Sequence, residues 1–387
     1  MMTKELPVGY HRFSKKPFVN YQLNRWWSLG FTRFGEIEEA GRRIRSFADN
    51  REVFVELAER AAGEGRLKNA AFYRRAAEFL AAPTDPAKFE LYEQFSRAFY
   101  EAFAEDGIER HRVPYGGSHL SAMRLAPQQT DGGAAGDGAK GTVVIQGGFD
   151  SFIEEFYCFW RAFAEAGYEV IAFDGPGQGA SLHRYGVASD HDWEKPVGAV
   201  LDYFSRDDVA LLGISFGGYW CVRAAAFEKR VTRIVIDPPF YDLLAARGRL
   251  VRKMVNWMLR HRGFLNWSIR TRAKVVPTIE HVMNQVLLVN RRLDADPALA
   301  AEWLLSMNKH HIHSHLIDQD VLLLGGEKDR FQSPALYELQ KAALVNARSL
   351  EGRIFTEAEH AANHCQMGNL GLALDYMTDW LDRVSSI

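Results

Sequence analysis

The sequence predicts an α/β protein built on a mostly parallel, doubly wound sheet, with one helical segment before the sheet and another inserted into it. Apolar strands alternate with amphipathic helices from about residue 142 to 236, and again after residue 320. From about residue 35 to 107 the sequence shows only helical periodicity, and so does the stretch that interrupts the alternation. Strand–helix alternation is typical of a parallel sheet covered by helices on both faces.

Residues 1–107 are expected to form an N-terminal helical accessory or lid domain. Apolar residues recur at helical spacing over 36–54, 67–80 and 88–103. Two prolines separate the last two of these segments, and proline interrupts helical hydrogen bonding. No alternating strand pattern occurs in this part of the sequence, so we place it outside the sheet.

Residues 108–240 are expected to form the first part of the core. It opens with a β-hairpin, because the segments 109–114 and 119–125 flank a Gly116-Gly117 turn. The stretch 127–141 is rich in glycine and alanine and has nothing to bury, so it is interpreted as a flexible surface loop. The alternating segments follow, with strands at 142–146, 168–173, 209–214 and 231–236, and helices at 152–166, 193–204 and 217–227.

Residues 241–313 show helical pattern alone and are expected to form an inserted cap. The second part of the core, 314–387, restores the alternation. A helical block inserted into an α/β core is how a lid over an active site appears in a sequence. The restored segments are strands at 321–324 and 352–355, and helices near 334–344 and at 370–384.

Charge, cysteine content and hydropathy exclude several classes of protein. The formal net charge is -2, which gives no global attraction to nucleic acid or to an acidic membrane. Cys158, Cys221 and Cys365 are too few and too far apart for a disulfide framework or a thiolate zinc site. No apolar run is long enough to span a membrane, and the N-terminus lacks the apolar segment of a secretory signal. We expect a cytoplasmic protein with no metal, no cofactor, and no nucleic-acid or membrane partner.

The strongest chemical signal is the segment Gly213-Ile-Ser-Phe-Gly217, which follows an apolar strand and opens an alanine-rich helix. In this context G-x-S-x-G is the signature of a nucleophile elbow. The turn is so sharp that the residues two positions from the serine must be small, and both are glycine. The elbow raises Ser215 above the sheet at a helix N-terminus, where developing negative charge is stabilised. The alternative is an ordinary turn with a serine cap.

The segment after the inserted block supplies a candidate acid. A nucleophilic serine needs a base and the base needs an orienting acid, and behind such an elbow the chain order is serine, acid, histidine. Asp329 follows the strand at 321–324 and a Gly-Gly turn, at the carboxyl edge of the sheet. It is favoured over Glu327 because it lies farther into the loop. Asp320 precedes the strand and is expected at the wrong end.

Two histidines, His360 and His364, follow the next strand and are the candidate bases. His364 lies closer to the C-terminal helix, where a base-bearing loop is expected to end. The pattern therefore favours His364 and keeps His360 as the alternative. The histidine that is not the base would be a surface or supporting residue.

The loop after the first buried strand, Gln146-Gly-Gly-Phe-Asp-Ser151, is expected to complete an oxyanion hole. One donor is the backbone N–H of Phe216, the residue after the serine, and the other comes from this loop. Glycine lets the backbone approach a substrate closely, so Gly148 is assigned as the second donor. Phe149 is kept as the alternative.

Two other motifs are interpreted as structural. Asp174-Gly-Pro-Gly-Gln-Gly179 follows a strand but lacks the pattern and the lysine of a phosphate-binding loop, so a tight turn is favoured. The run His310-His-Ile-His-Ser-His315 has no carboxylate or cysteine cluster beside it. A lead-in to the next strand is therefore favoured over a metal site.

The inserted block carries a run of cations among Trp257, Met258, Phe264 and Trp267. We interpret the run as a solvated helix face that pairs with the acidic N-terminal domain. The alternatives are a lid that attracts an anionic, aromatic substrate, and a nucleic-acid patch. The aromatic and methionine residues fall on helical spacing and are expected in the core or in a pocket lining. The cations are Arg247, Arg249, Arg252, Lys253, Arg260, Arg262, Arg270, Arg272 and Lys274.

Together these motifs resemble a subgroup of α/β-hydrolases with an N-terminal helical domain, which includes 2,6-dihydropseudooxynicotine hydrolase and fungal pigment-pathway hydrolases that shorten polyketides. The resemblance covers most of the chain. It implies an α/β-hydrolase fold and a triad of Ser215, Asp329 and His364, because the subgroup places its base in the His-Cys pair. It also implies that the N-terminal helices help to close the active site, and it is compatible with a homodimer. The matching segments are 146–151, 173–179, 213–218, 325–329 and 364–366.

The resulting hypothesis is a serine hydrolase that acts on a carbonyl compound through an acyl-enzyme. The resemblance implies that the scissile bond is an ester, a thioester or a carbon–carbon bond next to a ketone, in a hydrophobic aromatic or polyketide-like small molecule. One member of the subgroup also depends on a carboxylate from its cap. Two alternatives are kept: an acyltransferase or cyclase with the same triad, and a non-catalytic interaction protein on this fold.

Overall fold

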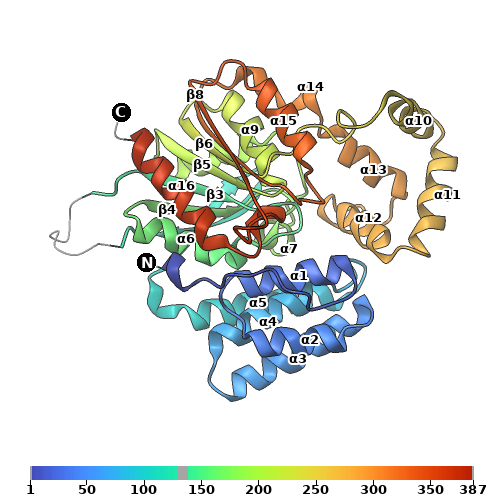
Figure 1. Ribbon diagram of the computed structural model, residues 1–387, viewed down its shortest axis with the longest axis horizontal. Coiled ribbons are helices and arrows are strands. Elements are labelled where there is room, and N and C mark those ends of the chain that lie inside the picture. Colours follow the sequence, from blue (N-terminus) through green and yellow to red (C-terminus); the bar gives the residue numbers. More distant parts are fainter. Residues whose placement is uncertain (1, 129–137, 386–387) are drawn as a thin grey trace.

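The computed structural model describes residues 2–128 and 138–385 (Figure 1). Within them, one eight-stranded sheet has the order β1-β2-β4-β3-β5-β6-β7-β8. Strands β3 to β8 run parallel, and the β1–β2 hairpin lies antiparallel at one edge. The predicted α/β class with a mostly parallel sheet is confirmed. The strands are β1 (Glu109–Tyr115), β2 (Ser118–Leu125), β3 (Thr142–Gln146), β4 (Glu169–Asp174), β5 (Val209–Ile214), β6 (Val231–Asp237), β7 (Asp320–Gly326) and β8 (Ser349–Phe355).

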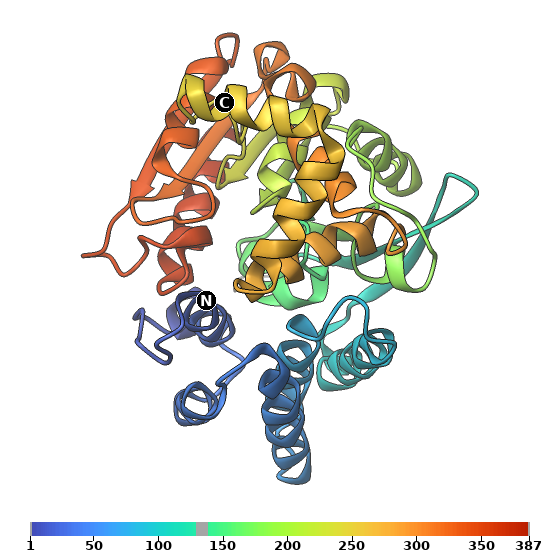
Figure 2. The same cartoon turned by 90° about the vertical axis from the view of Figure 1, so that its right-hand side faces the viewer.

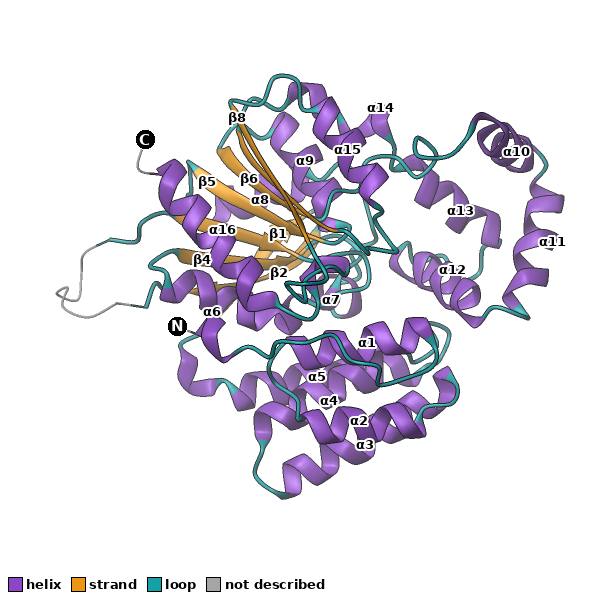
Figure 3. Cartoon of the chain, viewed as in Figure 1, coloured by secondary structure: helices purple, strands orange, loops and turns teal. Residues whose placement is uncertain are grey.

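Helices cover both faces of the sheet (Figure 3). Side chains alternate along a strand, so Val143 and Ile145 of β3 face one layer and Val144 faces the other. Helices α6 and α16 pack on the first face, while α8, α9 and α15 pack on the second. These helices are α6 (Tyr157–Glu165), α8 (Glu194–Phe204), α9 (Gly217–Phe227), α15 (Pro334–Ala343) and α16 (Leu370–Ser385), with the short α7 (Gly179–His183) after β4.

The predicted core elements lie within a few residues of the observed ones. Strand β5 and helix α9 have the predicted bounds. The helix predicted over 152–166 begins with a short 3-10 turn and continues as α6. Most of the loop predicted over 127–141 lies outside the described residues. The 3-10 turns are η1 (Met2–Glu5), η2 (Ala104–Asp106), η3 (Ile153–Phe156), η4 (Ser314–Leu316) and η5 (His364–Gln366).

Five N-terminal helices pack together beneath the core in Figure 1. The single helix predicted over 36–54 is wrong. A new helix starts after Ser46, whose hydroxyl accepts the Asp49 N–H while the Asp49 carboxylate accepts the Ser46 N–H. Helix α1 was not predicted, because it buries polar side chains such as Asn24 and Arg25 and so lacks a clean apolar stripe. The helices are α1 (Pro17–Ser28), α2 (Phe34–Arg43), α3 (Phe47–Gly63), α4 (Leu67–Phe79) and α5 (Ala87–Ala102).

A second helical block lies between β6 and β7. In Figure 2 its yellow and orange helices face the viewer, in front of the core and above the blue N-terminal helices. The expectation that its aromatic residues are buried is wrong at the outer helices, since Trp257, Phe264 and Trp267 are exposed. The block contains α10 (Arg249–Arg260), α11 (Arg262–Ala273), α12 (Pro277–Val289), α13 (Pro297–Ser306) and α14 (Lys309–Ile312).

Two further sequence expectations concern the whole fold. In the part of the chain that the structure describes, no helix is both long enough and apolar enough to cross a bilayer. Cys158, Cys221 and Cys365 are all buried as free thiols.

The loops that leave β3, β5, β6 and β7 meet at the carboxyl edge of the sheet, which is where α/β folds place their ligand sites.

Candidate active site

Ser215 occupies a strained turn between β5 and α9. Its φ angle is 59°, in the left-handed region that a residue with a side chain rarely adopts. The turn requires small neighbours: a Cβ at Gly213 would collide with the Gly217 carbonyl oxygen, and a Cβ at Gly217 would lie 2.8 Å from the Gly147 carbonyl oxygen. The sequence therefore forms the predicted elbow, and the elbow lifts the Ser215 hydroxyl into a cavity.

The structure brings Ser215, His364 and Asp329 together in one hydrogen-bonded row. His364 Nε2 lies 2.9 Å from Ser215 Oγ, and His364 Nδ1 lies 2.7 Å from Asp329 Oδ2. Both His364 and Asp329 are buried. This is the arrangement in which a carboxylate orients an imidazole and the imidazole can accept a serine proton.

Asp329 is held by the loop that carries it. Its second oxygen, Oδ1, accepts the backbone N–H groups of Phe331 at 2.8 Å and Gln332 at 2.9 Å. The competing acids are elsewhere: the Glu327 carboxylate is exposed and accepts the Glu357 N–H, and Asp320 pairs with Arg348 at the opposite end of β7. Position and hydrogen bonding thus favour Asp329 over both.

The surroundings of His364 set its proton affinity. Burial lowers the pKa of the imidazole, but the facing Asp329 carboxylate and the adjacent Cys365 raise it, and the net pKa lies well above the ordinary value of 6.5. A raised pKa strengthens His364 as a base once it is neutral. It also means that the neutral form appears only at higher pH.

The alternative base, His360, lies in a different place. It is exposed and lines an outer cavity rather than contacting the serine. Among the described residues it has no hydrogen bond to Ser215 or Asp329. The sequence pattern left two candidates for the base, and of these only His364 contacts Ser215 and Asp329.

The loop after β3 approaches the serine, and its two candidate donors, the N–H groups of Gly148 and Phe149, differ in their hydrogen bonds. The Gly148 N–H already donates to Ser151 Oγ at 2.9 Å, whereas the Phe149 N–H has no acceptor among the described residues. Of these two N–H groups, that of Phe149 is therefore the one left available to a ligand beside Ser215. Gly148 is needed for space, because a Cβ there would lie 2.9 Å from the Ser215 Cβ.

Two side chains that sequence reasoning missed brace this loop. Gln178, in the Asp174–Gly179 turn, donates from Nε2 to the Gly147 and Gly148 carbonyls at 3.0 and 2.7 Å. Arg75 of α4 donates from Nη2 to the Asp150 carbonyl at 2.8 Å. The turn that resembled a phosphate loop thus has a structural role, and an N-terminal helix contacts the loop directly.

A buried ionic network joins the N-terminal helices to the core. The Glu155 carboxylate, at the start of the α6 region, pairs with both Arg25 of α1 and Arg75 of α4, the latter at 2.7 Å. Arg75 also pairs with Glu78, which binds Lys88 at 2.6 Å. Buried charges persist only when they are paired, so this network specifies how the helices seat on the core. No local sequence pattern predicts it.

The cavity above Ser215, here called the inner cavity, has a volume of about 310 Å³. The core contributes aromatic walls from the loops that follow the strands. Helix α1 contributes Phe18, Tyr21 and Arg25, and the inserted block contributes His281, Val282 and Leu304. The lining is mostly apolar, as in sites that bind organic small molecules. The core aromatic residues are Phe149, Phe156, Phe216, Phe240 and Phe331.

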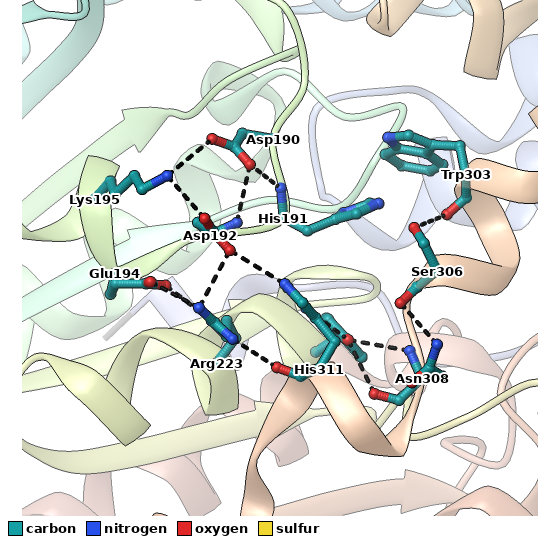
Figure 4. Close-up of polar contacts among 11 residues, drawn as sticks. Asp190, His191, Asp192, Glu194, Lys195, Arg223, Trp303, Ser306, Asn308 and His311 are labelled. Atoms are coloured by element: carbon teal, nitrogen blue, oxygen red, sulfur yellow. Dashed lines mark hydrogen bonds and ion pairs between the residues drawn. The ribbon is translucent and has the colours of Figure 1, made fainter.

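One member of the histidine run at 310–315, His311, ties the inserted block to the core (Figure 4). His311 Nε2 lies 3.1 Å from Asp192 Oδ1, and its carbonyl accepts from Arg223 Nη1 at 2.8 Å. Trp303 of α13 packs against His191, with ring centroids 4.7 Å apart, and against Phe149. His311 therefore has a structural role at the point where the chain returns to the core.

The cation run of the inserted block is solvated but does not pair as we expected. All nine cations are exposed, and the ion pairs found for them, Arg262–Glu302 and Arg270–Asp296, stay within the block. Among the described residues, no ion pair joins the run to residues 2–107. The predicted pairing with the N-terminal helices is wrong because those helices face α12, not the outer helices α10 and α11.

Several curated proteins are similar to this chain in sequence. The hydrolase acrC of Aspergillus aculeatus is 33% identical over 236 residues, which is 54% of this chain and 55% of that protein. The 20-hydroxy-prefusarin hydrolase FUS2 of Gibberella moniliformis is 32% identical over 254 residues, which is 58% of this chain and 59% of that protein. The chain thus spans little more than half the length of these relatives.

Solved structures resemble the chain in fold, and a family model matches its sequence. The 2,6-dihydroxy-pseudo-oxynicotine hydrolase superposes with a TM-score of 0.63 at 20% identity, covering 92% of this chain and 94% of that one. AbyA5 superposes with a TM-score of 0.64 at 17% identity, covering 90% of each chain. At these identities the likeness concerns the fold. The model of the alpha/beta hydrolase family matches residues 142–368, more than half of the sequence, and the chain therefore belongs to the alpha/beta hydrolase family.

Proposed function

We propose that this protein is a serine hydrolase that forms an acyl-enzyme on Ser215. The observation that carries the proposal is the row from Ser215 Oγ through His364 to Asp329, with separations of 2.9 and 2.7 Å, at the floor of an apolar cavity. The fungal relatives that are named as hydrolases add support.

In the proposed reaction, His364 accepts the proton of Ser215 as the oxygen attacks the substrate carbonyl. The Asp329 carboxylate stabilises the imidazolium. The backbone N–H groups of Phe149 and Phe216 donate to the developing oxyanion. His364 then passes its proton to the departing group, and the acyl-enzyme remains. Water attacks next: its proton goes to His364 and then to Ser215, while the acid leaves.

We propose a hydrophobic aromatic or polyketide-like substrate with an ester or thioester bond. The apolar lining of the inner cavity supports this class. A carbon–carbon bond next to a ketone is less well supported. The residues that the inserted block contributes to the inner cavity include no carboxylate, and the subgroup member that the sequence resembles depends on one.

The roles of the helical segments belong to the same proposal. Residues 1–107 and the cap, 241–313, would close the site over a core formed by 108–240 and 314–387. Side chains of α1 and α12 in the inner cavity support this division. A homodimer and a cytoplasmic location stay predictions, the latter supported by three free, buried thiols.

The proposal is tested with Ser215→Ala and a panel of aryl esters, thioesters and β-diketones analysed by mass. Turnover of the best substrate should fall by at least about 10⁴-fold, with an unchanged melting temperature. In the wild type, a fluorophosphonate should add its mass to Ser215. Retained turnover in the variant would overturn the proposal, as would labelling elsewhere. A dominant product in which a dilute added amine or alcohol outcompetes bulk water would indicate an acyltransferase instead.

A further inference from the structure

A second cavity, here called the outer cavity, adjoins the inner one and has a volume of about 950 Å³. The two cavities share side chains from α1, from α12, and from the loops that carry Asp329 and His364. Any ligand that passes from the outer to the inner cavity therefore moves along the same wall that ends at the catalytic row. The shared residues are Phe18, Tyr21, Val282, Arg330, Phe331 and His364.

The charges around the outer cavity have one dominant sign. Its lining includes the cations Arg12, Lys15, Lys328 and Arg330, but only one carboxylate, Glu357, which pairs with Lys328. Among the described residues, the other three cations have no ion-pair partner. The chain as a whole carries a formal net charge of -2, so this excess is local. A concave surface lined by charges of one sign focuses their field on the space between them.

The cations come from separate parts of the chain. Arg12 and Lys15 belong to the extended segment before α1. A hydrogen bond attaches this segment to the core: the Gly9 N–H donates to the Gly368 carbonyl at 2.7 Å. Lys328 and Arg330 flank Asp329 in the loop after β7. Each cation alone is an exposed, solvated side chain. Their convergence on the outer cavity is a property of the fold and not of one charged segment.

The opposite wall of the outer cavity is apolar. Helix α12 contributes Ile279, Val282 and Met283, and Phe18 and Phe331 continue this surface toward the inner cavity. A ligand that satisfies both walls must carry an apolar body and a negative charge. The nine cations of 247–274 line neither cavity, so the cation run of the inserted block does not provide this recognition.

We propose that the outer cavity is an anion-binding vestibule, and that the substrate joins its reactive carbonyl, through an apolar segment, to a carboxylate or phosphate group held near Arg330, Arg12 and Lys15. This inference rests on the proposed function, because it assumes that the carbonyl lies at Ser215. Arg330 is the pivotal residue, since it alone of the cations lines both cavities.

The test measures binding without turnover, in the Ser215→Ala protein. The probes are monoanilides of succinic, adipic and suberic acid, the methyl ester of each, and the matching anilide that ends in a phosphate. At least one length of acid should bind about tenfold more tightly than its methyl ester, and the preference should shrink between about 50 and about 500 mM NaCl. Comparison of the carboxylate and phosphate series identifies the preferred anion.

Arg330→Gln should weaken binding of the preferred anion by about fivefold to tenfold, with methyl-ester affinity changed less than about twofold. The matched control is Arg252→Gln, an exposed cation on α10 that lines neither cavity, and it should leave both affinities unchanged. If Arg330→Gln fails to fold, Arg12→Gln combined with Lys15→Gln tests the same surface from the other segment.

Equal affinity for acids and methyl esters at every length would overturn the vestibule, and so would an equal loss in Arg252→Gln. These outcomes are separable from the fate of the proposed function. Hydrolysis of neutral aryl esters by the wild type with no anion preference would refute the vestibule alone. If the protein prefers anionic ligands but Ser215 is not labelled by the fluorophosphonate and Ser215→Ala keeps its turnover, only the proposed hydrolase function is refuted.

Discussion

The two sides of the inner cavity face the same space but are built differently. On the core side, Ser215 and Asp329 follow the buried strands β5 and β7, and His364 forms hydrogen bonds to both. On the helical side, Phe18 of α1 and Val282 of α12 present apolar surface. Under the proposed function, this difference corresponds to a division of labour in which the sheet fixes the reacting groups and the helices select the substrate.

The two sides also differ in how they are held. The core side depends on local geometry, such as the elbow around Ser215 and the two N–H groups that hold Asp329. The helical side is held by long-range contacts, such as the Glu155 pairs with Arg25 and Arg75. Changes on the core side should therefore alter the rate of chemistry, and changes on the helical side should alter substrate range or stability.

The largest effect after loss of the serine is expected for Asp329→Asn. An amide in place of the carboxylate neither stabilises an imidazolium nor fixes the required tautomer of His364, so kcat should fall by about 10³-fold to 10⁴-fold. Glu327→Gln is the matched control, because Glu327 lies two residues away with an exposed carboxylate, and its kcat should stay within about twofold. Steady-state kinetics on the best aryl ester measures both. An equal loss of kcat in the two variants would show that kcat depends on the structure of the loop and not on the Asp329 carboxylate.

We also expect Asp329→Asn to change the pH dependence of kcat/KM. The base must be neutral, and the pKa of His364 is raised well above 6.5, so activity should be lost as pH falls through a value above 6.5. In Asp329→Asn the largest raising influence is gone while burial still lowers the pKa, so the acid limb should move to lower pH. A profile of log kcat/KM against pH measures the limb. If the acid limb stays at the same pH in Asp329→Asn, the group that titrates in the profile is not His364.

Gly148→Ala should have the next largest effect. The added Cβ would lie 2.9 Å from the Ser215 Cβ and 3.2 Å from its hydroxyl oxygen, so either the serine or the oxyanion loop must shift. A displacement of this kind costs about 10²-fold in kcat. Gly263→Ala serves as the control, since a Cβ there meets nothing within 4 Å and alanine favours helix α11. Wild-type kcat in Gly148→Ala would contradict the close fit of loop and serine.

The accuracy of sequence-based prediction follows the same division. Strand β5 and helix α9 were predicted with their observed bounds because turn chemistry and periodicity are local signals. Helix α1 was missed because Arg25 is buried through its partner Glu155, 130 positions away in sequence. The bond from the Gly148 N–H to Ser151 Oγ could not be predicted, because it depends on a side-chain conformation. The lining of the cavity depends on how segments meet, which no local pattern records.

On the helical side, Val282→Trp should narrow both cavities. We expect kcat/KM to fall about tenfold for bulky aryl esters and to change less than about twofold for acetyl esters, because the reacting groups are untouched. Glu280→Trp adds the same bulk at an exposed position of α12 that lines neither cavity, and should affect neither substrate. Ratios of kcat/KM across an acyl-length series are the measurement. Equal losses for small and bulky esters would mean that α12 takes part in the chemistry.

The smallest effect is expected for Tyr21→Phe, which tests whether the helical side positions the base at all. The Tyr21 hydroxyl donates to the His364 carbonyl at 3.3 Å, so α1 contacts the base-bearing loop. Tyr337→Phe is a close match, since the Tyr337 hydroxyl donates to the Leu323 carbonyl at the same 3.3 Å, away from the site. Both variants should lose about 1 kcal/mol of unfolding free energy. If the division of labour holds, kcat stays within about threefold in both. A clear drop in kcat for Tyr21→Phe alone, at equal stability loss, would show that α1 helps to set the His364 geometry and would blur the boundary between the two sides.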